Sequence, residues 1–278
     1  MAKRKRNINI EKMIREGRGQ GRGPEYKPWI RIQDVPSLGR ATRLKGIKTK
    51  RQHEFLSDME RNYFYFLEFS DSVADIREQF PLLPLEDTIL IAEELGLEHP
   101  KNPKTGEFIV MTTDFFISVK NNNEFYEVAR TIKLKDELIN RRVLEKFEIE
   151  RVYWKNRNIN WGIVTDNEID KNIANNISFV HAYNDIRYLD CFNQISKMEL
   201  QDLIYEFIKR ILDSNKNMRT ICSQFDNDMS LKKGSGLSIF KYLIINKVIN
   251  VDITKKIDIN NIVPVSIREE SVKKVGII

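Results

Sequence analysis

The sequence predicts an α/β chain of two domains, on three observations. Between residues 52 and 168, patterns typical of a helix, three strands, a second long helix and a fourth strand follow one another. Two of the strand patterns, Met111–Val119 and Glu124–Lys133, flank a polar run with three asparagines, which favours a β-hairpin. From about residue 168 the composition shifts towards Ile, Asn and Lys. An α/β layer of this order buries its central strands and leaves the strand ends for chemistry.

The composition is that of a globular protein with a sizeable core. The 278 residues are 41% hydrophobic and 31% charged, enough for one large or two ordinary domains. No apolar run approaches the ~20 residues that a membrane span needs, and the amino terminus lacks the apolar segment of a secretory signal. Cys191 and Cys222 lie far apart and the chain has three histidines, which argues against a zinc site or a disulfide framework and fits a reducing cytoplasm.

Charge is concentrated at the beginning of the chain. Residues 1–51 hold 16 Lys and Arg against 4 Asp and Glu, a balance of +12, whereas the whole chain carries +6 and the remainder therefore −6. A basic arm on a mildly acidic body indicates contact with a nucleic acid, although a solubilising tail is the alternative. The glycines of Gly17–Gly23 (GRGQGRG) favour contact, because they let the backbone approach phosphates while arginines pair with them.

Before the hairpin, the elements are expected in this order. Ile10–Glu16 is a short helix, and the proline-rich stretch Pro24–Gly39 is an irregular arm that Trp29 anchors to the body. A helix begins at Ser57 and runs to about Glu68, with one apolar face. Its Ser57-x-x-Glu60 start has two interpretations, a capping box or a metal-ligating acid. An alternating strand and a helix follow, at Val73–Phe80 and Leu85–Leu95.

After the hairpin, a long amphipathic helix is expected at about Asp136–Asn158 and a buried strand at Trp161–Thr165. The second domain is predicted to hold three helices followed by two alternating strands. These are the helices Met198–Asp213, Met218–Asp226 and Ser238–Lys247, and the strands Val248–Ile257 and Asn261–Ile267. Helices followed by a hairpin fit a winged-helix-like unit, which could contact DNA or a protein partner.

The hairpin can bring an acid and a lysine together. Strand alternation puts Asp114 on the face opposite Thr113, and Thr131 and Lys133 on one face of the second strand. A carboxylate, a second acid and a backbone carbonyl such as that of Ile132 can hold a divalent metal. An ammonium there can orient water or stabilise charge on a scissile phosphate. The pattern resembles the Asp…(Glu/Gln)-x-Lys of restriction-endonuclease-like nucleases, but acids and lysines at strand ends are usually just solvated.

A set of motifs in order makes the chain resemble the TnsA family, the endonuclease subunits of heteromeric cut-and-paste transposases. The likeness runs from about residue 15 to 170. It is carried by GRGQGRG at Gly17–Gly23, LSDME at Leu56–Glu60, DIREQFPLL at Asp75–Leu83, MTTDF at Met111–Phe115, LEKFEIERVYW at Leu144–Trp154 and TDNEI at Thr165–Ile169.

Charge, composition and element order together predict three parts: a basic arm over 1–51, a restriction-endonuclease-like nuclease domain over 52–168 and a winged-helix-like domain over 169–278. The resemblance implies a bacterial protein at the nucleoid that cuts the 5′ strand of double-stranded DNA at transposon ends, with a TnsB-like transposase and a TnsC-like ATPase as partners. The family's metal ligands fall on Glu60 and Asp114 and its lysine on Lys133, with Mg²⁺ as cofactor and Mn²⁺ as substitute.

One position departs from the family pattern. Two residues before the lysine the family usually has Gln, and here Thr131 would hold metal through a water, beside the carbonyl of Ile132. The DNA contacts expected of the arm are phosphate contacts without sequence readout, made by Arg18, Arg22, Lys27 and Arg31. Two alternatives stay open: a DNA-binding scaffold that has lost catalysis, which Thr131 favours, and a stand-alone restriction-type endonuclease that cuts without partners.

Overall fold

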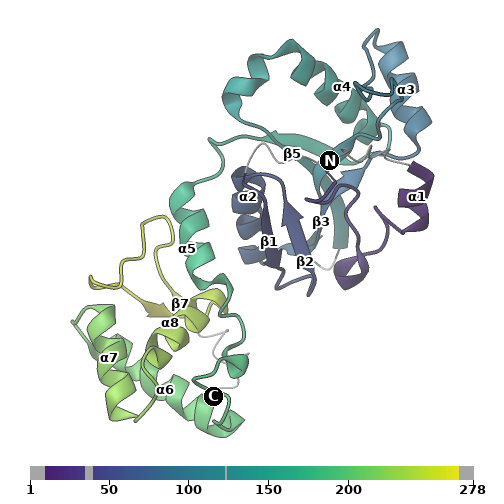
Figure 1. Ribbon diagram of the computed structural model, residues 1–278. Coiled ribbons are helices and arrows are strands. Elements are labelled where there is room, and N and C mark those ends of the chain that lie inside the picture. Colours follow the sequence, from purple (N-terminus) through teal and green to yellow (C-terminus); the bar gives the residue numbers. More distant parts are fainter. Residues whose placement is uncertain (1–9, 35–39, 123, 269–278) are drawn as a thin grey trace, which may run out of the picture. The chain divides into compact units, whose positions relative to one another are not determined.

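The computed structural model describes residues 10–34, 40–122 and 124–268, and the chain divides between Ile169 and Asp170 into two compact units (Figure 1). The first unit is built on a four-stranded mixed sheet, and the second is mainly helical. Among the described residues, every helix is too short or too polar to span a lipid bilayer.

The mixed sheet has the strand order β3-β4-β5-β6. Neighbours are antiparallel from β3 to β5, whereas β5 and β6 run parallel. The bounds are β3 Val73–Pro81, β4 Thr112–Asn121, β5 Glu124–Ile132 and β6 Asn160–Val164. The predicted hairpin is confirmed as β4–β5, and the strands predicted on either side of it are confirmed to within one residue.

Helices cover both faces of this sheet. Phe115 and Phe116 are neighbours on β4 and therefore point to opposite faces. The Phe115 ring lies 5.4 Å from that of Tyr63 on α2 (Asp58–Phe69), and Phe116 stacks 4.8 Å from Trp154 on α4 (Arg141–Lys155). Helix α3 (Leu85–Glu94) packs beside α4, and Ile91 and Ala92 join the core around Phe116.

Helix α4 begins five residues later than its apolar pattern predicted. The Asn140 side chain accepts hydrogen bonds from the backbone of Arg142 and Val143, so it caps the helix there. The preceding residues form the 3₁₀ helix η2 (Lys135–Ile139), and Ile139 is 89% exposed. The residues expected to form the first turn of this helix are therefore a separate 3₁₀ helix.

The expected basic arm is part of the first unit wherever it is described. It contains α1 (Ile10–Arg15), the 3₁₀ turn η1 (Gly23–Glu25) and β1 (Thr42–Lys45), which pairs antiparallel with β2 (Gln52–Phe55) just after the arm. Trp29 anchors it, as predicted: the ring is buried with Met13 and Val110, and its backbone N–H donates to the Gln79 carbonyl at 3.1 Å. Residues 1–9 and 35–39 of the expected arm lie outside the described residues.

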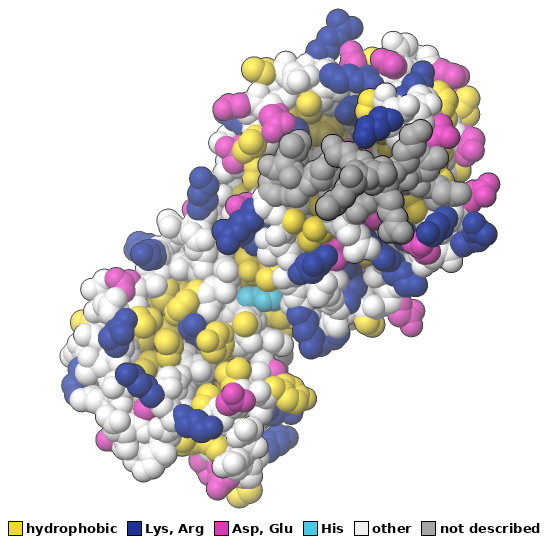
Figure 2. All heavy atoms as spheres, viewed as in Figure 1, with side chains coloured by type: hydrophobic (Ala, Val, Ile, Leu, Met, Phe, Trp, Pro, Cys, Tyr) yellow, Lys and Arg dark blue, Asp and Glu magenta, His cyan; other side chains and the backbone are white. Residues whose placement is uncertain are grey.

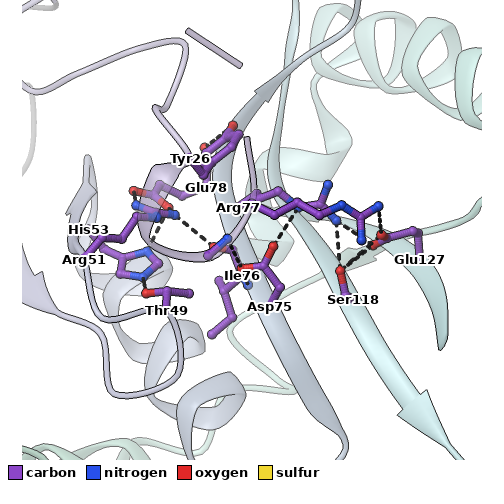
Figure 3. Close-up of polar contacts among 12 residues, drawn as sticks. Tyr26, Thr49, Arg51, His53, Asp75, Ile76, Arg77, Glu78, Ser118 and Glu127 are labelled. Carbon is purple, nitrogen blue, oxygen red and sulfur yellow. Dashed lines mark hydrogen bonds and ion pairs between the residues drawn. The ribbon is translucent and has the colours of Figure 1, made fainter. Parts of the chain in front are cut away.

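A buried polar network joins this N-terminal segment to β3 (Figure 3). The fully buried Glu78 accepts a hydrogen bond from Arg51 at 2.7 Å and lies 2.8 Å from His53, whose other ring nitrogen is 2.7 Å from Thr49. Although burial would raise it, the charges and hydrogen bonds of His53 and Arg51 hold the pKa of Glu78 at about 2. The network fixes β3 immediately before Gln79, a residue of the candidate site.

The second unit packs four helices around an aromatic and aliphatic core that includes Phe207, Phe225 and Phe240. The helices are α5 Lys171–His181, α6 Lys197–Asp213, α7 Met218–Asp228 and α8 Ser235–Ile245, with the 3₁₀ turn η3 Ile186–Tyr188 between α5 and α6. The three helices predicted here are confirmed. Helix α5 was not predicted.

The two long strands predicted at Val248–Ile257 and Asn261–Ile267 are wrong. They shrink to a two-residue ladder between β7 (Ile249–Asn250) and β8 (Ser266–Ile267). Asp252 accepts a hydrogen bond from the Thr254 backbone N–H, and Asp258 accepts one from that of Asn260. Such local bonds compete with strand pairing, so an apolar alternation alone does not make a strand here.

Candidate active site

A cavity of about 600 Å³ opens in the first unit, where the beginning of α2, the beginning of β4, the end of β5 and the middle of α4 meet. All the residues expected to form the metal and catalytic set line it, namely Glu60, Asp114, Thr131, Ile132 and Lys133. The four arm cations expected to contact DNA do not line it. Residues more than 70 positions apart in the sequence are thus brought to one place.

Asp114 is held by one hydrogen bond on each carboxylate oxygen. Oδ2 accepts from the Ile132 backbone N–H at 2.7 Å, and Oδ1 accepts from the Gln79 side-chain amide at 3.1 Å. Burial raises the pKa of Asp114 to about 6, although these two hydrogen bonds and the charge of Lys133 act in the other direction. The carboxylate is therefore oriented, but its ionised form is not fully stabilised by the protein alone.

Glu60 has the capping role that the sequence offered as one of two interpretations, and its carboxylate also lines the cavity. Its backbone N–H donates to the Ser57 hydroxyl at 3.1 Å, while its carboxylate accepts from that hydroxyl at 2.9 Å and from the Leu56 backbone N–H at 3.1 Å. It thus caps the beginning of α2, through Leu56 rather than the Ser57 N–H of a standard capping box. Burial, and next the charge of Asp114, raise the pKa of Glu60 to about 7. Glu60 is therefore a cap that also borders Asp114.

Lys133 follows β5 and is fixed by its backbone, which donates to the Val164 carbonyl at 3.0 Å. Its ammonium forms an ion pair with Glu137 of η2, and both side chains line the cavity. The charge of Lys133 lowers the pKa of Asp114, so the ammonium is near that carboxylate as well. A phosphate that used Lys133 would compete with Glu137 for it.

The structure adds Glu150 of α4, which was not predicted from the sequence. Its Oε1 accepts hydrogen bonds from the Thr131 hydroxyl at 2.5 Å and from the Thr113 hydroxyl at 2.6 Å. Burial raises the pKa of Glu150 to about 7, with the two threonine hydroxyls opposing the shift and the charge of Asp114 adding to it. The Thr131 hydroxyl is therefore directed to Glu150 and accepts from Trp161 at 3.2 Å, instead of facing Asp114.

A sequence signal for Glu150 did exist. It lies between Ile149 and the pair Tyr153-Trp154 on the buried stripe of α4. A carboxylate on an apolar helix face is unfavourable unless hydrogen-bonding or charged partners compensate. An acid at that position of an amphipathic helix is therefore a candidate site residue on its sequence pattern alone.

Gln79 is the second site residue that was not predicted. It has a φ of 49°, rare for a residue other than glycine, and its amide bridges Asp114 and the Thr112 hydroxyl. Beside it, the expected alternation of β4 fails. Thr113 bonds to Glu150 and Trp154 of α4 while Phe116 stacks on the same Trp154, so Thr113 and Phe116 contact the same helix. The irregular backbone of β3 at Gln79 coincides with this break.

The donor chemistry of the cavity fits a hard divalent cation. The carboxylates of Glu60 and Asp114 are hard oxygen donors that line one cavity, and their charges repel each other without a cation. Among the described residues, however, no three His, Cys, Asp or Glu side chains group to hold a metal ion. A cation here would need backbone or water oxygens in addition to the two acids.

The arm cations have different environments. Arg18, expected on the DNA surface, is 9% exposed, donates to the Trp29 carbonyl at 3.0 Å and pairs with Asp34 at 2.5 Å and Glu16 at 2.9 Å. The Arg18 guanidinium is therefore engaged inside the N-terminal segment. Arg22 is exposed and pairs with Glu127 of β5 at 3.0 Å, and the exposed Lys27 donates to the Glu16 carbonyl.

Comparison with known proteins matches both units. The family described as "TnsA-like endonuclease N terminal" matches residues 70–166, which include Asp114, Lys133 and Glu150, and "TnsA endonuclease C terminal" matches residues 168–253. The chain is 38% identical over 255 residues to the transposon Tn7 transposition protein TnsA of Escherichia coli. That alignment covers 91% of this chain and 89% of the relative.

Proposed function

Because the chain belongs to the TnsA endonucleases of Tn7-type transposition, we propose that the cavity between α2, β4, β5 and α4 hydrolyses phosphodiester bonds of DNA. The observation that carries the proposal is the convergence of Glu60 and Asp114 with Lys133 in one cavity. The order of helices and strands around the cavity supports a restriction-endonuclease-like core. Beyond residue 168, a winged-helix-like unit is supported by the helices alone, since the expected hairpin is reduced to the short β7–β8 ladder.

The substrate in this proposal is double-stranded DNA at the ends of a transposon, cut on the 5′ strand. The partners are a TnsB-like transposase, which would act on the other strand, and a TnsC-like ATPase. Support comes from the family and from the relative, which is named as a transposition protein. The second unit, a separate compact body, is the part proposed to contact a partner or DNA.

The cofactor in this proposal is Mg²⁺, with Mn²⁺ as a substitute. Glu60, Asp114 and the Ile132 carbonyl would hold it, with Thr131 at most reaching it through water, since that hydroxyl bonds to Glu150. Bound there, the cation would offset phosphate charge and lower the pKa of an attacking water.

The protein's own residues then have separate tasks. The Ile132 N–H and the Gln79 amide hold Asp114 in one orientation, and Leu56 and Ser57 do the same for Glu60. Lys133 leaves Glu137 and orients the water that attacks phosphorus. The water oxygen forms a new bond to phosphorus and loses a proton to solvent, the bond from phosphorus to the leaving oxygen breaks, and that oxygen takes up a proton from solvent.

Flanking DNA would be held through its phosphates by cations of the N-terminal segment, in this proposal Arg22, Lys27 and Arg31 without Arg18. Arg22 and Lys27 are exposed, and Lys and Arg side chains also lie over the β1–β2 region in Figure 2. Contacts of this kind set the position of the duplex and carry no base sequence information.

The test is Asp114→Asn in the full chain, assayed with TnsB- and TnsC-like partners on an end-labelled transposon-end duplex. We expect 5′ cutting to fall about 1,000-fold or more, since several kcal/mol of charge stabilisation is lost at 1.36 kcal/mol per factor of ten. The matched control is Asp136→Asn, an exposed acid outside the cavity, which should cut normally. EDTA should abolish cutting, and Mg²⁺ or Mn²⁺ should restore it.

Two other outcomes identify the alternatives. A wild-type protein that binds DNA but never cuts it with either metal would be a scaffold without catalysis. A wild-type protein that cuts alone as fast as with its partners would be a stand-alone endonuclease. Undiminished cutting by Asp114→Asn would remove the cavity from the reaction.

A further inference from the structure

Lys146 is a second lysine of the cavity, and the reaction described above does not use it. It lies on α4 one turn before Glu150, about 40° around the helix from it, so the two side chains share the stripe that faces the cavity. Glu150 is buried at the floor, whereas Lys146 is exposed at the rim. The cavity therefore has acids below and an ammonium at its mouth.

The charge of Lys146 has no partner within the described part of the chain. The other cations nearby are engaged: Lys133 pairs with Glu137, and Arg142 donates to the Glu98 carbonyl at 2.7 Å and pairs with Glu145 at 3.1 Å. Among the described residues, none forms a hydrogen bond or an ion pair with the Lys146 ammonium.

The surroundings of Lys146 favour the arrival of an anion. Burial, and next the charges of Arg142 and Lys133, lower the pKa of Lys146. Lys146 therefore lies near two other cations and has no acidic partner among the described residues, and a phosphate group would supply one.

We propose that Lys146 binds a backbone phosphate of the cleaved DNA strand, next to the scissile phosphate that Lys133 and Asp114 approach. The cavity would then hold two consecutive phosphates, one over the acids and one at the rim on α4. This proposal rests on the proposed function, since a nucleic-acid strand is the ligand that brings regularly spaced phosphates to the cavity.

The first experiment compares Lys146→Gln with Lys155→Gln in the full reaction with partners. Lys155 is an exposed lysine of the same helix, about 180° around it from Lys146. We expect Lys146→Gln to lower kcat/KM for 5′ cutting about 10-fold and to reduce the salt slope of DNA binding by about 1, as loss of one phosphate contact does. Lys155→Gln should match wild type, and Lys146→Arg should restore most of the activity. Thermal unfolding of each variant confirms that it is folded.

The second experiment replaces single phosphates of the cleaved strand by uncharged methylphosphonates, one position at a time. At the linkage that Lys146 contacts, wild type and Lys146→Gln should cut equally, because the charge that distinguishes them is gone; elsewhere the difference should persist. A difference that persists at every position, or a Lys146→Gln variant that behaves as Lys155→Gln, overturns the proposal. An error in the proposed hydrolase function would be seen separately, because the Asp114→Asn variant would then still cut DNA.

Discussion

Glu150 places a carboxylate on the buried face of α4, between Ile149 and Tyr153. Its raised pKa of about 7, against an ordinary value of 4.5, means that the folded chain binds this proton more tightly than the unfolded chain does. By linkage, the stability that Glu150 contributes is fully present below pH 4.5 and is lost as the pH rises through about 7. The pKa values of Glu60 and Asp114 are raised as well, so the stability that these two acids contribute is also lost as the pH rises.

We therefore expect Glu150→Gln to stabilise the metal-free protein at pH 8 and to be nearly neutral at pH 5. The amide resembles the protonated acid and keeps an oxygen for the Thr113 and Thr131 hydroxyls. The gain at pH 8 should be at most about 3 kcal/mol, the value of the pKa difference at 1.36 kcal/mol per unit. The measurement is thermal unfolding in EDTA at both pH values.

The control for this prediction is Glu148→Gln on the same helix. The hydrogen bond and charge of Arg151 lower the pKa of Glu148, so its loss should give no gain at pH 8. A Glu150→Gln difference of equal size at both pH values would show that Glu150 does not titrate between pH 5 and pH 8, against this prediction.

The same residues show what the sequence could reveal of the site. Asp114 and Lys133 could be placed together because they lie at the paired ends of one hairpin, and strand pairing is a local property. Glu60 could be assigned to the same site only through the family motif LSDME at Leu56–Glu60, because hydrophobic periodicity gives no such indication. Glu150 and Gln79 could not be found by alternation, because one lies on a helix and the other lies where the backbone of β3 is irregular.

At the scale of elements, the GRGQGRG loop packs closely against the end of β3. Gly19 has a φ of 73°, and a Cβ there would lie 2.3 Å from Cγ of Pro81, the last residue of β3. The sequence pattern favoured a role for these glycines in approaching phosphates. The structure gives Gly19 a role in seating the N-terminal segment against the sheet.

We expect Gly19→Ala to destabilise the first unit by about 2–4 kcal/mol, as the sum of a left-handed backbone and a clash with a stiff ring. Gly23→Ala is the matched variant: its φ is also positive, 52°, but nothing lies within 4 Å of the added Cβ. It should cost about 1 kcal/mol, from the backbone alone. Urea unfolding measures the free energy of unfolding of both variants. Equal losses would mean that Pro81 moves away from the added Cβ at no measurable cost.

The elements predicted correctly are those with a strong period and few competing local bonds, such as β3 and α6. The first strand expected after α8 failed where Asp252 bonds to the Thr254 backbone N–H, a local bond that apolar alternation does not report. The pair β1–β2 was missed because β1 lies in the basic stretch Arg40–Arg51 and β2 directly follows it, and the charged residues there mask a short alternation.

At the scale of the molecule, the two units have separate cores. The second is built around Phe207, Phe225 and Phe240, and the first around residues such as Phe116 and Trp154. All three tryptophans of the chain, Trp29, Trp154 and Trp161, precede residue 170. Tryptophan fluorescence therefore reports the first unit, whereas far-UV circular dichroism reports both.

This separation predicts that a core mutation in one unit leaves the other unit's unfolding unchanged. Phe225 is fully buried and meets Phe207 edge to face at 5.0 Å, so Phe225→Ala should remove about 3–5 kcal/mol from the second unit. We expect the circular dichroism transition to split or shift to lower urea while the fluorescence midpoint stays in place. Phe55→Ala, in the first unit, should move the fluorescence midpoint instead. A fluorescence midpoint that follows Phe225→Ala would mean that the two cores unfold as one, and that a partner bound to the second unit could stabilise the cavity in the first.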